Sequence, residues 1–172
     1  KTVTASNAEL EAMRDDIRGM AKNDLPATAA ELSAIAESAG QLGIHNENII
    51  EFTETMANMD VATNLNSEEA AEEFAKFANI TAMSQENFDN LGSSVVALGN
   101  NMATTESDIV AMGMRIAAAG HQINLSEADI MAYAAALSSV GIEAEAGGTA
   151  FSKLLINLQM AVETGKNLKE YA

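Results

Sequence analysis

The residues with the most chemical potential in this chain are two histidines and a large set of carboxylates. His45 and His121 are the only histidines, and the chain has 25 acidic residues and no cysteine. Without cysteine the chain has no disulfide, no thiolate zinc site and no cysteine nucleophile. A zinc site of the H-E-x-x-H type needs two histidines four residues apart, which this chain lacks. We therefore predict no metal site and interpret both histidines as structural or solvated.

The carboxylates could in principle provide a catalytic pair for glycoside hydrolysis. That chemistry needs one acid held protonated in a cleft while a second stays ionised. Many of the acids here stand instead at expected helix starts, where capping and the positive helix end are a sufficient explanation. The pair Gly147-Gly148 lacks the strand, the G-x-G-x-x-G pattern and the lysine of a phosphate loop. We predict no enzyme activity, no catalytic residue and no cofactor.

The net charge of -16 is unevenly distributed along the chain. Residues 1–22 carry four basic and four acidic side chains, whereas residues 23–152 carry 19 acidic ones and only Lys76 and Arg115 as basic ones. A protein that binds a phosphate backbone needs a basic stripe, so we predict no autonomous nucleic-acid binding. Two interpretations of this excess of acidic side chains remain open. In one they form a solvated face, and in the other they repel DNA or another acidic surface.

The length of 172 residues suits one domain or two small ones. No apolar run reaches the roughly 20 residues that cross a bilayer, so we predict no membrane span in this segment. No basic stretch precedes an apolar one, as it would in a signal peptide. Because the first residue is Lys1, we expect a segment cut from a larger protein.

Helix is the structure that composition and apolar spacing favour throughout. Pro26 is the only proline, and Ala, Glu, Leu and Met lose little on helix formation. Apolar residues recur with the spacing +3, +4, +3, which places one stripe along one side of each helix. Six stripes follow this rule: Leu32–Leu42, Ile49–Met59, Phe88–Leu98, Ile109–Ala119, Ile130–Val140 and Phe151–Ala161.

The ends of the helices are marked by capping residues and by glycines. Ser, Thr or Asn followed by an acid predicts a helix start, because the side-chain oxygen accepts from free N–H groups. Glycine predicts a helix stop, and we expect Gly99 and Gly141 to adopt positive φ. The residues that we expect to determine the turns of the fold are Gly43, Asn46, Gly99, Thr105, Asp108, Ser126, Asp129, Gly141, Gly147 and Gly148.

These marks predict an all-α fold: a compact array or irregular bundle of about eight short helices of 12–18 residues. The turns are too frequent for a coiled coil, which needs three or four uninterrupted heptads. We expect a helical lead-in at 1–24, a main helical domain at 25–162 and a C-terminal tail at 163–172. For Gly147-Gly148, a flexible turn and a close helix contact are both open.

Several motif blocks, taken in order, resemble the tape measure (minor tail) proteins of phage tails. The blocks span about residues 25–162 and are 41–52 (QLGIHNENIIEF), 59–65 (MDVATNL), 68–71 (EEAA), 98–109 (LGNNMATTESDI) and 136–151 (ALSSVGIEAEAGGTAF). The resemblance implies a structural role in tail assembly and length determination. It implies contacts with tail tube and tail tip proteins, tail assembly chaperones and possible self-association. The implied location is the lumen of the virion tail, and the host cytoplasm during assembly.

The resemblance carries no catalytic residues onto this chain, since the matched positions are helix turns. A different interpretation is a bacterial helical module for protein–protein interaction or signalling, with no phage role. Such a module would share the acidity and the stripes but would not need the ordered motif blocks.

Overall fold

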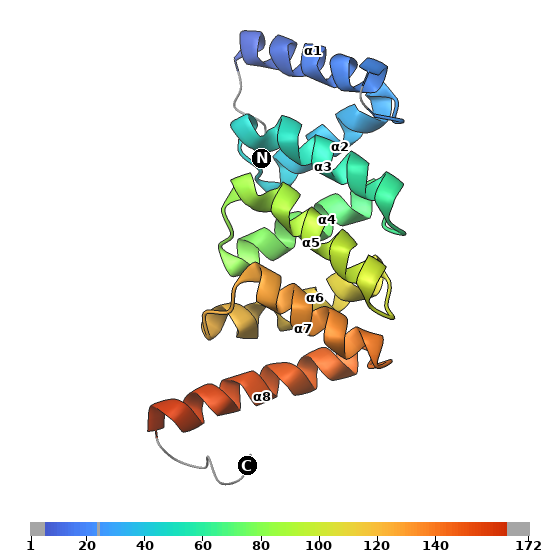
Figure 1. Cartoon of the computed structure of the whole chain (residues 1–172). Helices are drawn as coiled ribbons and strands as arrows, with labels where there is room; N and C mark the ends of the chain where they lie inside the picture. Colours follow the sequence, from blue (N-terminus) through green and yellow to red (C-terminus); the bar gives the residue numbers. More distant parts are fainter. Residues whose placement is uncertain (1–5, 24, 165–172) are drawn as a thin grey trace. The chain divides into compact units, whose positions relative to one another are not determined.

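The computed structural model describes residues 6–23 and 25–164, and every regular element in them is helical (Figure 1). The predicted all-α array of about eight short helices is confirmed for these residues. The elements are α1 (Asn7–Asn23), α2 (Ala29–Leu42), the 3-10 turn η1 (Asn46–Asn48), α3 (Ile49–Ala62), α4 (Ser67–Thr81), the 3-10 turn η2 (Gln85–Asn87), α5 (Phe88–Asn101), α6 (Glu106–Gln122), α7 (Glu127–Ser139) and α8 (Ala144–Thr164).

The chain divides into two compact units, Lys1–Val96 and Ala97–Ala172, and the division falls inside α5. The boundaries expected from the sequence, at 24/25 and 162/163, remain a prediction.

In the first unit, α2 is the central helix. It packs against α1, α3 and α4, and α3 also packs against α4 (Figure 1). Phe52 of α3 meets Phe88 edge to face, with ring centres 4.6 Å apart. The core of this unit consists of large side chains that are almost fully buried: Leu32, Ile35, Ile49, Phe52, Met56, Phe74, Phe77 and Phe88.

In the second unit, α6 packs against both α7 and α8. Two glycines of α6 allow α7 to approach closely. A Cβ on Gly113 would lie 2.8 Å from the Sδ of Met131, and a Cβ on Gly120 would lie 2.7 Å from Cγ1 of Ile130. The α6–α7 packing therefore requires glycine, or a shift of a buried side chain, at both positions.

The predicted apolar stripes of α2, α3, α5 and α6 are largely buried, but the predicted stripes of α7 and α8 are only partly so. In α8, Leu154 was expected inside and is 38% exposed. In α7, Tyr133 and Val140 were expected inside, yet they are 44% and 72% exposed. The buried face of α7 consists instead of Ile130, Met131, Ala134 and Ala135. The glycines of α6 select this face, because they leave space for Ile130 and Met131.

A turn of one kind follows α2, α4 and α6. In each, one residue has positive φ: Gly43 at 93°, Ala82 at 55° and Asn124 at 61°. The next residue (Ile44, Met83 or Leu125) is apolar, and its N–H donates to the carbonyl five residues earlier at 2.9–3.0 Å. This is the hydrogen bond of the Schellman motif, and an apolar residue at this position is its usual companion.

The recurrence of this turn reveals a repeat of two helices. The side chains that cap α2, α4 and α6 are Thr28, Asn66 and Thr105, which stand 38 and 39 residues apart. Six residues after each positive-φ residue, a large apolar side chain (Ile49, Phe88 or Ile130) is fully or almost fully buried. The pairs α2–α3, α4–α5 and α6–α7 are therefore three versions of one helix-pair repeat.

The shared turn predicts opposite effects for two exchanges at equivalent positions. Positive φ strains a residue that has a Cβ, so Ala82→Gly should stabilise the protein, and Gly43→Ala should destabilise it, each by roughly 0.5–1 kcal/mol. No atom lies within 4 Å of a Cβ added at Gly43, so only backbone strain contributes there. Urea denaturation measures both changes. A shift of the same sign in the two variants would contradict the equivalence of the turns.

Candidate interaction surface

At two of the predicted helix starts, the side chain of the capping residue accepts a hydrogen bond from a backbone N–H of the first turn. The Oγ of Ser126 accepts from the N–H of Asp129 at 3.1 Å, and the Asp129 carboxylate accepts from the Ser126 N–H at 3.4 Å. Thr105 accepts from the Asp108 N–H at 3.2 Å and donates its hydroxyl to the Asp108 carboxylate at 2.6 Å. Thus Ser126 caps α7 and Thr105 caps α6. That these caps determine the fold remains a prediction.

The predicted glycine turns divide into two groups. Gly43 and Gly141 have φ of 93° and 78° and follow α2 and α7. Positive φ at Gly99 was wrong, because α5 continues to Asn101. A Cβ at Gly99 would lie 2.6 Å from the Cδ of Glu106, so this glycine faces the start of the next helix instead.

Two further turn predictions need correction. Gly147 and Gly148 are not a flexible turn: they are buried inside α8, in its first turns. A Cβ on Gly148 would collide with the Cβ of Arg115 in α6, so the pair serves a close helix contact. Asn46 does not begin a long helix, because it opens the 3-10 turn that precedes α3.

Both histidines lie at the ends of helical elements. His45 stands before η1, where its backbone N–H donates to the side-chain oxygen of Gln85 at 2.7 Å. Gln85 also donates to the carbonyl of Gly43 at 3.2 Å, so one glutamine joins two equivalent turns of the repeat. His121 is exposed in the last turn of α6. In the described part of the chain, no three His, Asp or Glu residues are grouped to hold a metal.

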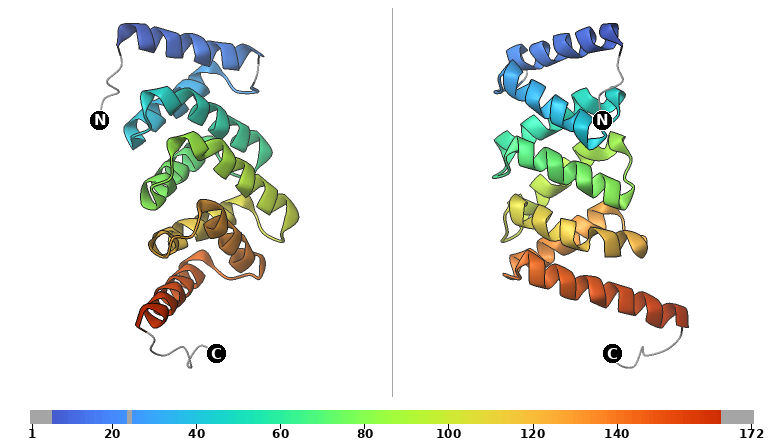
Figure 2. Two further views of the ribbon diagram at one scale, coloured as in Figure 1. Left: turned by 60° about the vertical axis from the view of Figure 1, so that its left-hand side comes forward. Right: turned by 180° about the vertical axis from the view of Figure 1, so that it is seen from behind.

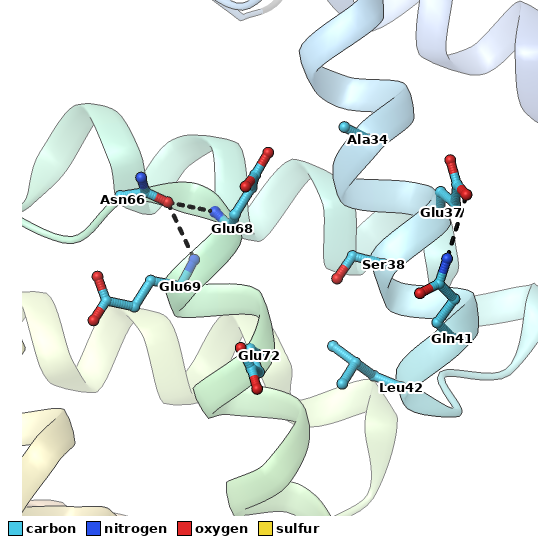
Figure 3. Close-up of a pocket in the computed structure, with 9 residues that line it drawn as sticks. All are labelled: Ala34, Glu37, Ser38, Gln41, Leu42, Asn66, Glu68, Glu69 and Glu72. Atoms are coloured by element: carbon cyan, nitrogen blue, oxygen red, sulfur yellow. Dashed lines mark hydrogen bonds between the residues drawn. The ribbon is translucent and has the colours of Figure 1, made fainter.

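An open groove of about 780 Å³ lies between α2 and the start of α4 (Figure 3). We call it the acidic groove. Its lining includes four glutamates and no basic residue; in full it consists of Ala34, Glu37, Ser38, Gln41, Leu42, Asn66, Glu68, Glu69 and Glu72. Asn66 accepts from the N–H groups of Glu68 and Glu69 at 2.9 and 3.1 Å, which fixes the α4 side of the groove.

Next to the acidic groove, the pKa of Glu73 is raised above its ordinary value. Burial raises the pKa of Glu73, and the nearby Glu69 and Glu72 raise it further, while Lys76 lowers it. Lys76 is itself held by Glu72 at 2.5 Å. The groove can thus attract cationic side chains of a partner and repel a phosphate backbone. Sequence analysis missed the groove, because Glu37 and Glu69 come together only through the packing of α2 on α4.

The raised pKa of Glu73 predicts a pH dependence of stability. The folded protein holds this proton more tightly than the unfolded chain, so the carboxylate destabilises the fold as pH rises above about 4.5. Glu73→Gln should therefore stabilise the protein at pH 7 by about half a kcal/mol or less, since solvent screens a partly exposed charge. The gain should vanish below about pH 4, where both states are protonated.

Urea denaturation at pH 4 and pH 7 checks this expectation. Glu163→Gln, which removes one charge from α8, is the control for net charge. A gain from Glu73→Gln that is equal at both pH values would contradict the electrostatic explanation.

No helix in residues 6–23 and 25–164 is long and apolar enough to cross a membrane.

Comparison with known proteins assigns the chain to a family. The family model described as "Phage-related minor tail protein" matches residues 14–171, most of the chain. No curated protein and no solved structure matches it. The chain therefore belongs to the phage-related minor tail protein family.

Proposed function

Starting from membership of the phage-related minor tail protein family, we propose that this chain is a folded segment of a tail tape measure protein that takes part in tail assembly and length determination. The match over residues 14–171 carries the proposal. The motif blocks between residues 41 and 151 support the finer identification, because they resemble blocks of tape measure proteins and occur in the same order.

The dimensions of the helices suggest what this segment contributes. As one continuous helix, 172 residues would extend about 260 Å at roughly 1.5 Å per residue. The observed helices have 13–21 residues and are therefore only about 20–32 Å long. A ruler acts through its extended length. We propose that this segment is an interaction or assembly-initiation module beside the measuring region; its unfolding into extended helices inside the tube is the alternative.

The proposed partners are other tail components: tube subunits, the tail tip, the assembly chaperones and further copies of the chain. The proposed location is the lumen of the virion tail, and the host cytoplasm before assembly. The acidic groove supports a protein partner over DNA, since its glutamates would repel phosphate. The family match favours this proposal over a bacterial signalling module with no phage role.

Deletion of one helix pair from the parent protein tests the module. Removing residues 66–104, which hold α4 and α5, should leave the length of completed tails unchanged and lower their yield. If the segment instead serves as a ruler in the form of one extended helix, loss of the 39 residues should shorten each tail by about 60 Å. Electron microscopy of negatively stained tails measures both quantities.

Duplication of the same 66–104 segment is the matched control, because it changes the residue number by the same amount in the opposite sense. Tails that lengthen on duplication and shorten on deletion would contradict the module and favour the ruler. Normal tails in normal yield from both variants would contradict any role in assembly.

A further inference from the structure

The last part of α5 contains no buried side chain. In its first part, Phe88, Leu91 and Val95 are 1%, 4% and 0% exposed, whereas every side chain in residues 96–103 is half-buried or exposed. We call residues 96–103 the α5 end. The boundary between the two compact units falls within it, although α5 is one continuous helix, drawn in yellow-green in Figure 2. The helix therefore continues beyond the part of α5 that burial stabilises.

The equivalent end of α3 is held by burial. The repeat aligns Ile49 of α3 with Phe88 of α5, so residues 57–64 correspond to the α5 end. In this stretch Ala57 and Met59 are only 4% and 3% exposed. Helices in proteins owe most of their stability to packing, so the end of α3 should be more stable than the α5 end.

Local interactions do not compensate for the missing burial. Residues 99–101 are Gly-Asn-Asn, which have low helix propensity. The only charged residue of α5 is Asp89, so no ion pair between successive turns supports the helix. After α5 the N–H of Met102 donates to the carbonyl of Leu98 at 3.0 Å, and no residue in 96–105 has positive φ. The α5 end therefore lacks the left-handed turn that follows α2, α4 and α6.

Fixed residues stand on both sides of the α5 end. Before it, Val95 is completely buried in the first unit. After it, the hydroxyl of Thr104 is hydrogen-bonded to that of Ser138 in α7, within the second unit. Thr105 then caps α6 by accepting from the N–H of Asp108 at 3.2 Å. The weakly held stretch is thus confined to the residues between Val95 and Thr104.

We propose that the α5 end is a hinge, which unwinds locally while α3 and α6 stay folded and so lets the two compact units turn relative to each other. Segments with few buried contacts open at a lower free energy than the core, and hinges absorb backbone changes at the ends of elements. Unwinding the α5 end breaks the last backbone hydrogen bonds of α5 but exposes no buried side chain. The proposal does not depend on the function proposed above.

Amide hydrogen exchange of the 172-residue chain tests the hinge. Amides of the α5 end should be protected about tenfold less than those of residues 57–64. Local unwinding exposes little surface, so urea up to about 1 M should leave exchange of the α5 end nearly unchanged while it accelerates exchange in α3 and α6. Equal protection of the two helix ends, or a urea dependence at the α5 end equal to that of α3 and α6, would overturn the proposal.

Two exchanges at equivalent positions locate the opening. Ala97 and Asn58 are both exposed and occupy the same place in α5 and α3. Ala97→Gly should lower the protection of the α5 end about fivefold, because glycine disfavours helix, and leave α3 and α6 unchanged. Asn58→Gly should leave the protection of the α5 end unchanged. If Ala97→Gly instead lowered protection equally throughout the chain, the α5 end would unfold only with the whole protein, and the hinge would be wrong.

Limited proteolysis of the unaltered chain gives a second, independent measurement. Chymotrypsin prefers aromatic residues, and Tyr133 of α7 is 44% exposed, whereas Leu98 is half-buried. Because a protease cuts backbone that has opened, the first cut between residues 25 and 160 should follow Leu98 or Met102. A first cut at Tyr133, or anywhere else in that range, would contradict local opening of the α5 end.

Discussion

The fold depends on one local hydrogen bond that recurs at the ends of helices. After α1, α2, α4, α6 and α7, a backbone N–H donates to the carbonyl five residues earlier, and the donor residue is always apolar. Helices of 13–21 residues are marginal in water by themselves. The bond reverses the chain, and after α2 and α4 the donor side chains Ile44 and Met83 are buried, so these helices are followed by a turn packed onto the fold. Mutual burial of the stripes then follows from the turns.

The sequence predicted these turns well where side chains and glycine mark them directly. Thr105, Ser126 and Gly141 have the caps or the positive φ that their residue types favour. Ala82 was not identified as a turn residue, because alanine gives no such signal and the turn forms despite the strain of a Cβ. Asn124 was also missed, although asparagine often takes the positive-φ position at a helix end. Gly99 shows the converse: its role is a contact with Glu106, and a contact between helices leaves no local signature.

Surfaces were harder to predict than helices, for the same physical reason. Spacing within a helix tells which residues share a side, but the partner decides which side is buried. In α7 the glycines of α6 override the expected stripe and leave Tyr133 and Val140 exposed. The acidic groove likewise needs two helices, α2 and α4, whose relative placement no single stretch of sequence contains.

The local character of the turns has a mechanical consequence. Because each turn bond joins residues only five apart, tension along the chain would meet few hydrogen bonds between distant residues, those of Gln85 to the turn after α2 being the exception described above. We expect helix pairs of this kind to unfold one after another under load, and a fully extended pair of 38 or 39 residues has a contour length of about 130 Å. We therefore expect the chain to extend under tension in steps of one helix pair.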